Sequence, residues 1–143
     1  MTKTALSGTF IFRGLMLVQF TSLLVTAALA AFMAGGLVGM AALWGGAICL
    51  LAHAWAGFQI WLHPRNQEPR HQAGAAIRAE LGKIAIMLLL FWLSFREWPD
   101  LRGKQAAAAL LVSFFVVQTA GWIWLARATG GPPPAGPPGD KEG

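Results

Sequence analysis

The sequence predicts an all-α integral membrane protein whose four transmembrane helices form two hairpins. Hydrophobic residues make up 56% of its 143 residues and charged residues only 12%, whereas soluble domains carry about 25% charged residues. With 11 basic and 6 acidic side chains, so small a chain could not cover the surface of a soluble enzyme. Moreover, the segment from Gly14 to Pro64 contains no Asp, Glu, Lys or Arg. Since one span needs about 20 residues, this segment is long enough for two spans and a turn.

The first hairpin is expected to comprise spans at residues 12–33 and 38–62, after a cytoplasmic N-terminus of residues 1–11. Its turn is placed at Gly35 and Gly36, because each glycine lowers helix propensity by about 1 kcal/mol relative to alanine. Pro64 prevents the second span from continuing much further, since proline lacks the amide donor that a helix interior requires.

The second hairpin is expected after a polar loop at residues 63–79, which is rich in arginine and contains two prolines. The uncharged core of span 3, residues 84–95, is too short to cross alone. The prediction therefore extends this span to residues 80–98, with long basic side chains at its ends reaching the headgroups. A short charged turn leads to span 4 at residues 105–126. Residues 12–127 thus form the transmembrane domain, and the Pro- and Gly-rich tail at residues 128–143 is expected to be disordered, because it has little to bury.

The distribution of basic residues predicts the orientation, since short cytoplasmic loops are enriched in Lys and Arg. An even number of spans puts both termini and the 63–79 loop on one side. That side carries the larger group of basic residues: Lys3, Arg13, Arg65, Arg70, Arg78, Lys83, Arg127 and Lys141. The opposite side carries only Arg96, Arg102 and Lys104. Both termini are therefore expected in the cytoplasm. Because the basic residues form no continuous stripe, the net charge of +5 does not indicate nucleic-acid binding.

A cleaved signal peptide is the alternative interpretation of the first span, because Ala28-Leu29-Ala30 matches an A-x-A cleavage site. However, the apolar stretch before this site is longer than the roughly 7–15 residues of a signal-peptide core. The sequence also stays apolar beyond it. The transmembrane interpretation is therefore favoured.

Polar residues inside the predicted spans are candidates for functional contacts, because an unpartnered polar group is costly in hydrocarbon. Gln19, His53 and Gln118 are interpreted as interhelical hydrogen-bonding groups. His53 could alternatively bind a metal, but a metal site requires three or four ligands, and only Cys49 stands near it in its span. The sequence leaves metal binding unknown. As the single cysteine, Cys49 also excludes a disulfide framework.

Glu80 and Lys83 form the strongest candidate pair, because residues three apart lie on one face of a helix. A structural explanation also accounts for them: a carboxylate is favourable near a helix N-terminus, and a lysine can extend along apolar surface to the headgroups. No Ser-His-Asp, Walker, HExxH or paired-carboxylate arrangement is present. The sequence therefore predicts no catalytic residues, no cofactor and no enzyme activity.

Three short segments stand in a recognisable order: Gly46–Trp55 in span 2, the E-x-G-K motif of Glu80, Gly82 and Lys83, and Phe115–Gln118 in span 4. In order and spacing they resemble the bacterial ATP synthase protein I family, small membrane proteins associated with the F-type ATP synthase. The resemblance covers about residues 13–127. It implies a multi-pass protein of the bacterial cytoplasmic (inner) membrane that helps to assemble the membrane sector of the synthase. It also implies the ring of proton-carrying subunits as the favoured partner and the E-x-G-K motif as the docking or ion-interacting site.

The same resemblance carries an alternative function, a small divalent-cation (magnesium) channel or transporter. A cation conductor would typically show several acidic side chains facing one path, whereas Glu80 is the only acid at a cytoplasmic span edge. In a homo-oligomer several Glu80 carboxylates could form a ring, so this alternative stays open. The lipid bilayer is the other expected partner, and no nucleic acid is expected.

The predicted orientation can be tested by labelling cysteines from each side of the membrane. In a Cys49→Ala background, Gln67→Cys is expected to react only from the cytoplasmic side and Gly103→Cys only from the opposite side. Reaction of position 67 from the periplasmic side would reverse the orientation. A mature N-terminus at Ala31, found by sequencing the purified protein, would instead establish the signal peptide.

Overall fold

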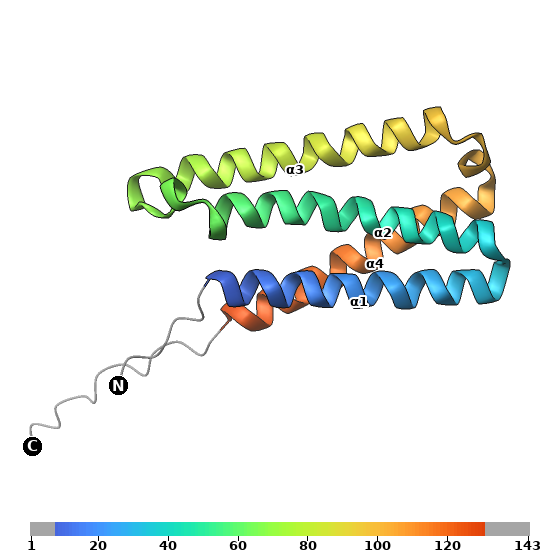
Figure 1. Cartoon of the computed structure of the whole chain (residues 1–143), viewed down its shortest axis with the longest axis horizontal. Helices are drawn as coiled ribbons and strands as arrows, with labels where there is room; N and C mark the ends of the chain where they lie inside the picture. Colours follow the sequence, from blue (N-terminus) through green and yellow to red (C-terminus); the bar gives the residue numbers. More distant parts are fainter. Residues whose placement is uncertain (1–7, 131–143) are drawn as a thin grey trace, which may run out of the picture.

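A computed structural model describes residues 8–130, apart from the side chains of residues 66 and 67. Residues 1–7 of the predicted N-terminus and residues 131–143 of the predicted tail lie outside the described residues. Four long helices run in alternating directions, so that α1 begins and α4 ends at the same end of the bundle (Figure 1). Their bounds are Gly8–Ala34 (α1), Gly36–Gly57 (α2), Pro69–Glu97 (α3) and Lys104–Thr129 (α4). The predicted all-α fold with four helices is confirmed.

Three short helical turns complete the described chain. A π-helical turn at Phe58–Leu62 extends α2, and 3-10 turns lie at Pro64–Gln67 before α3 and at Pro99–Arg102 before α4. In the last of these turns, Arg102 Nε donates to the carbonyl oxygen of Phe95 at 2.8 Å. This bond satisfies one of the carbonyls that the end of a helix leaves without an intrahelical partner.

A single residue, Gly35, joins α1 to α2. Its φ of 94° lies in the left-handed region that glycine adopts without steric cost. Just beyond it, a Cβ on Gly39 would overlap Ala31 of α1. The predicted turn at Gly35 and Gly36 is therefore confirmed, and glycine serves there both to reverse the chain and to let the two helices meet.

The central helix of the bundle is α2, which contacts α1, α3 and α4. A Cβ on Gly45 would overlap the backbone carbonyl of Leu110 in α4, and one on Gly46 would overlap Leu23 of α1. Small residues allow such close backbone approach in membranes. The buried small residues of α2 are Gly39, Ala41, Ala42, Gly45, Gly46, Ala52, Ala56 and Gly57.

The second hairpin is splayed, because α3 packs on α2 whereas α4 packs on both α1 and α2. The side chains of Phe91 in α3 and Phe114 in α4 still meet, with ring centroids 5.1 Å apart. Phe114 also belongs to the main buried cluster, together with Leu23, Ile48, Cys49 and Val117. The apolar core therefore lies chiefly among α1, α2 and α4, with α3 covering one side of α2.

The predicted loop at residues 63–79 is wrong over most of its length, because α3 begins at Pro69. Proline is well tolerated in the first turn of a helix, where its missing amide needs no intrahelical partner. The residues that follow are rich in alanine, the best helix former. Ala75 and Ala79 are buried while Arg70 and Arg78 are exposed, so the arginines belong to the outer face of a helix rather than to a loop.

Three helical segments within residues 8–130 are long and apolar enough to cross a membrane: Gly8–Ala34, Gly36–Leu62 and Lys104–Thr129. Glu80 and Lys83 within the first half of α3, with Arg96 and Glu97 in its last turn, shorten its uncharged stretch. However, α3 runs antiparallel alongside α2 between the two ends of the bundle (Figure 1). Its 29 residues extend about 44 Å at the rise of an α-helix. The chain is thus a multi-pass membrane protein, and this geometry favours the prediction that α3 is its fourth span.

The close contact between α2 and α4 predicts different effects for two glycine-to-alanine substitutions. Gly45→Ala is expected to destabilise the protein by about 1–3 kcal/mol, as overpacking typically does, because its Cβ would overlap the Leu110 carbonyl. Gly36→Ala meets nothing within 4 Å and is expected to be neutral or stabilising by up to about 1 kcal/mol. Unfolding of the detergent-solubilised variants, followed by circular dichroism, measures both. Equal stabilities would contradict the contact.

Candidate functional site

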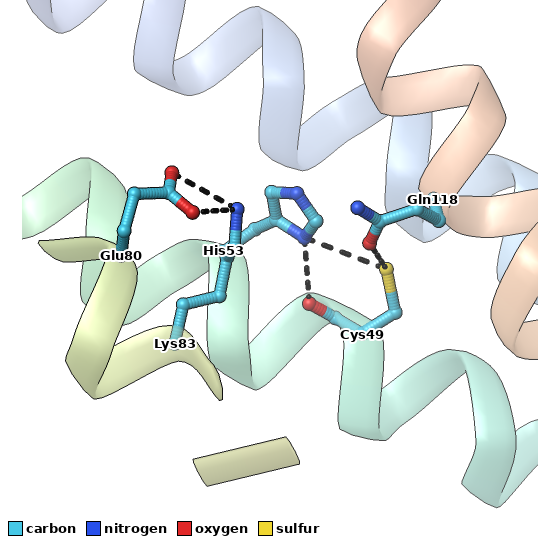
Figure 2. A network of polar contacts seen from close by, with 5 residues as sticks. All are labelled: Cys49, His53, Glu80, Lys83 and Gln118. Carbon is cyan, nitrogen blue, oxygen red and sulfur yellow. Dashed lines mark hydrogen bonds and ion pairs between the residues drawn. The ribbon is translucent and has the colours of Figure 1, made fainter. Parts of the chain in front are cut away.

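Three polar side chains converge on Cys49 in the middle of the bundle. Gln19 of α1, His53 of α2 and Gln118 of α4 are all buried there. The Cys49 thiol donates to Gln118 Oε1 across 3.2 Å, and its sulfur lies 3.4 Å from His53 Nδ1 and 4.0 Å from Gln19 Nε2. Figure 2 shows Cys49, His53 and Gln118 in this arrangement. Together these contacts link α1, α2 and α4.

The hydrogen bond of His53 assigns the tautomer of its ring. Nδ1 lies 2.9 Å from the backbone carbonyl oxygen of Cys49. Because a carbonyl oxygen only accepts, Nδ1 must carry a proton and donate, and in a neutral ring Nε2 is then an acceptor. Figure 2 shows that Nε2 points away from Cys49. The Cys49–His53 pair therefore leaves one unused acceptor on the imidazole.

Gln19 is less completely satisfied than the other members of this cluster. Its Oε1 is buried and has no hydrogen-bond partner among the described residues. Its amide lies against Gly121 of α4, where an added Cβ would come within 2.5 Å of Nε2. The glycine therefore makes room for Gln19 in the seam between α1 and α4.

Glu80 and Lys83 form an ion pair on α3, as their spacing predicts. Lys83 Nζ lies 3.0 Å from Glu80 Oε1 and 2.8 Å from Oε2, so the ammonium contacts both carboxylate oxygens. The two side chains differ in exposure: 59% of Glu80 is exposed against 14% of Lys83. Consequently the pair presents mainly its carboxylate to the surroundings, while the lysine lies underneath.

Gly82, between the two charged residues, is where α2 approaches α3 closely. A Cβ on Gly82 would overlap the indole ring of Trp55. The glycine of the E-x-G-K motif thus lets a tryptophan of the central helix lie against α3 next to the ion pair. At the opposite end of the same two helices, Trp44 Nε1 donates to Ser94 Oγ at 2.6 Å, which joins α2 to α3 a second time.

A cavity of about 130 Å³ lies at the end of the bundle where α1 begins and α4 ends. Glu80, Lys83 and His53 contribute polar groups to its wall, and Trp61 and Trp122 contribute indoles. The apolar remainder of the wall consists of Leu15, Ala56, Gly57, Ile60 and Leu125. Residues of all four helices therefore enclose a polar site near one end of the predicted transmembrane domain.

The predicted residues fall into two neighbouring groups. One comprises Gln19, His53 and Gln118 around Cys49, the other is the E-x-G-K motif, and His53 belongs to both because it also lines the cavity. Sequence reasoning missed the central place of Cys49, although its four-residue spacing from His53 was a signal. It also missed the packing of Trp55, at the end of the Gly46–Trp55 segment, against Gly82 of the E-x-G-K motif. Among the described residues, no group of three or more His, Cys, Asp or Glu side chains could hold a metal ion.

The family to which these features point can be tested by comparison with known proteins. The model of a family described as ATP synthase I chain matches residues 14–103. The match contains Gln19, His53 and the whole E-x-G-K motif, and it ends before α4. No curated protein and no solved structure matches the chain.

The unequal bonding of the two glutamines predicts unequal effects on stability. Gln118→Leu is expected to lower the free energy of unfolding by about 0.6–1.7 kcal/mol, the range for interhelical hydrogen bonds in membranes, because it removes the acceptor for Cys49. Gln19→Leu is expected to lower it less, since it removes only the 4.0 Å contact of Nε2 with Cys49 Sγ together with a buried oxygen without a described partner. Unfolding titrations in detergent measure both variants. A larger loss for Gln19→Leu would contradict this bonding pattern.

Proposed function

The chain belongs to the ATP synthase I chain family, whose members are non-catalytic accessory proteins, and on this premise we propose that it guides assembly of the membrane sector of the F-type ATP synthase. The ring of proton-carrying subunits is the proposed partner. Family membership implies association with the synthase. The assembly role and the choice of subunit are our proposal, as is the location in a bacterial inner membrane with both termini in the cytoplasm.

The docking site in this proposal is the E-x-G-K motif of Glu80, Gly82 and Lys83. The observation that carries it is the charged pair of α3 in the cavity wall, in which the Glu80 side chain is 59% exposed. Stabilisation of the helix alone would not require the glycine, because alanine is a better helix former. Gly82 instead lets Trp55 of α2 lie against α3 at the residue next to Lys83, and Lys83 in turn contacts both oxygens of Glu80. A fixed, partly exposed charge is suited to recognising a partner.

A divalent-cation channel is the second candidate function, favoured by the fact that the Glu80 carboxylate lines a cavity. In one copy of the chain, however, this carboxylate is already neutralised by Lys83. Hard cations such as Mg²⁺ are bound by several oxygen ligands, and within residues 8–130 the cavity offers one carboxylate. A channel would therefore require a homo-oligomer that gathers several copies of Glu80.

Removal of the charged pair is expected to impair assembly of the synthase without affecting the protein itself. In cells producing Glu80→Gln/Lys83→Met, recovery of assembled ring on native gels should fall about tenfold, the effect of losing about 1.4 kcal/mol of binding. Membrane levels of the variant should match those of the wild type, because an exposed helical ion pair contributes only about 0.2–0.5 kcal/mol to folding.

The matched control is Glu68→Gln/Arg70→Met, which removes the exposed ion pair at the start of the same helix and should leave assembly unchanged. Normal ring recovery with the Glu80/Lys83 variant would refute the docking site. If the variant instead abolished divalent-cation flux into liposomes while assembly stayed normal, the channel function would replace our proposal.

A further inference from the structure

We propose that the cavity between His53, Glu80 and Trp122 receives a cationic side chain, arginine or lysine, of the protein that docks there. This inference rests on the proposed function for the identity of the docking protein, and it adds the chemistry by which the site recognises it. Three features of the cavity carry the argument: an unused acceptor, an exposed carboxylate, and walls that suit an alkyl chain with a charged tip.

The unused acceptor is Nε2 of His53. His53 as a whole residue is 4% exposed, its Nδ1 donates to the Cys49 carbonyl, and within the described part of the chain Nε2 has no hydrogen bond. Figure 2 shows Nε2 directed away from α2, and His53 lines the cavity. As part of the cavity wall, this ring nitrogen can accept a hydrogen bond from a donor outside the chain. It is satisfied when a donor enters the cavity.

The exposed carboxylate is that of Glu80, which has acceptor capacity to spare. A carboxylate offers about four lone-pair positions, and Lys83 takes up one position on each oxygen. Because Glu80 is far more exposed than Lys83, an incoming group meets the carboxylate first. Guanidinium and ammonium groups carry several donors and no acceptor, so they match both Glu80 and Nε2 of His53.

The walls of the cavity fit the rest of such a side chain. Trp61 and Trp122 are part of the wall, and indole rings attract cations. Leu15, Ile60 and Leu125 supply apolar surface, along which the methylene stem of Arg or Lys can lie. The volume of about 130 Å³ is well above the roughly 10–15 Å³ that a single water requires.

An anionic group fits the same cavity less well. Among the described residues, Lys83 is the only Lys or Arg in the wall, and its ammonium is already paired with both oxygens of Glu80. An anion would also face the carboxylate and the lone pair of His53, both of which repel it. The proposal therefore predicts that the cavity binds a cation more tightly than an anion of similar shape.

The test uses the full-length protein in lipid nanodiscs and n-butylguanidinium as a probe, with n-butylurea and n-butylsulfonate as its neutral and anionic counterparts. The cation is expected to give saturable shifts of the indole NMR signals of Trp61 and Trp122, and the counterparts none. Saturable binding of n-butylsulfonate, or equal binding of n-butylurea, would overturn the proposal.

Substitutions of the residues that line the cavity test whether the probe binds there. Glu80→Gln is expected to weaken binding of n-butylguanidinium about tenfold, the scale of one lost ionic contact. Glu97→Gln, at the far end of α3, should have no effect on this binding. His53→Asn retains a donor but lacks Nε2, and should also weaken binding. Lys83→Met removes the competing ammonium and should bind the cation at least as tightly as wild type. Weaker binding by Lys83→Met with unchanged binding by Glu80→Gln would contradict the proposal, provided that the melting profiles agree.

The two proposals fail in different ways. If the cation binds as described but Glu80→Gln cells assemble the synthase normally, the cation site stands and the docking function at this motif is wrong. If Glu80→Gln cells lose assembly but the purified protein binds no cation, docking stands and the recognition of a cationic side chain is wrong.

Discussion

The structure depends on the small-residue surface of α2. Between helices in lipid there is little hydrophobic driving force, because the acyl chains are as apolar as the side chains, so association relies on close packing and polar contacts. Gly45 and Gly46 bring α2 against α4 and α1 at backbone distance. At that distance a single thiol, Cys49, can reach side chains on both neighbours. Larger residues at the two glycine positions would separate α2 from α4 and α1, and would so weaken the polar cluster that spans the three helices.

Much of the fold could be predicted from the sequence, because charge and glycine are strong signals in a membrane protein. The absence of charge from Gly14 to Pro64 and the glycines at the turn were enough to place α1 and α2. The arginines and prolines of the 63–79 segment are typical of a loop, but Pro69 stands at the first position of α3, where proline is compatible with a helix. Local composition does not distinguish a polar loop from the polar face of a helix that extends beyond the apolar layer.

The candidate site was predictable in its residues but not in its arrangement. The spacing of Glu80 and Lys83 foretold their ion pair, since both residues lie on one helix. That His53 would line the same cavity depends on how α2 and α3 are rotated and offset against each other, which a single sequence does not encode in any local pattern. The unequal exposure of the two charges has the same origin. Because the carboxylate is the more exposed of the two groups, the proposed site prefers a cationic ligand, which an equally exposed ion pair would not do.

The one-residue turn at Gly35 has a consequence for how the chain enters the bilayer. The α1–α2 hairpin has no polar segment at its tip, and it carries no charge between Gly14 and Pro64. In the proposed orientation both helices can therefore partition into lipid together, without moving any hydrophilic loop across. The α3–α4 hairpin must carry the charged residues between Arg96 and Lys104 to the side of the membrane opposite the termini, at a cost of about 2.5–3.5 kcal/mol for each charge at the bilayer centre. In that orientation the first hairpin is the half with the lower cost of insertion, and α3 and α4 are the half that has to carry charge across the bilayer.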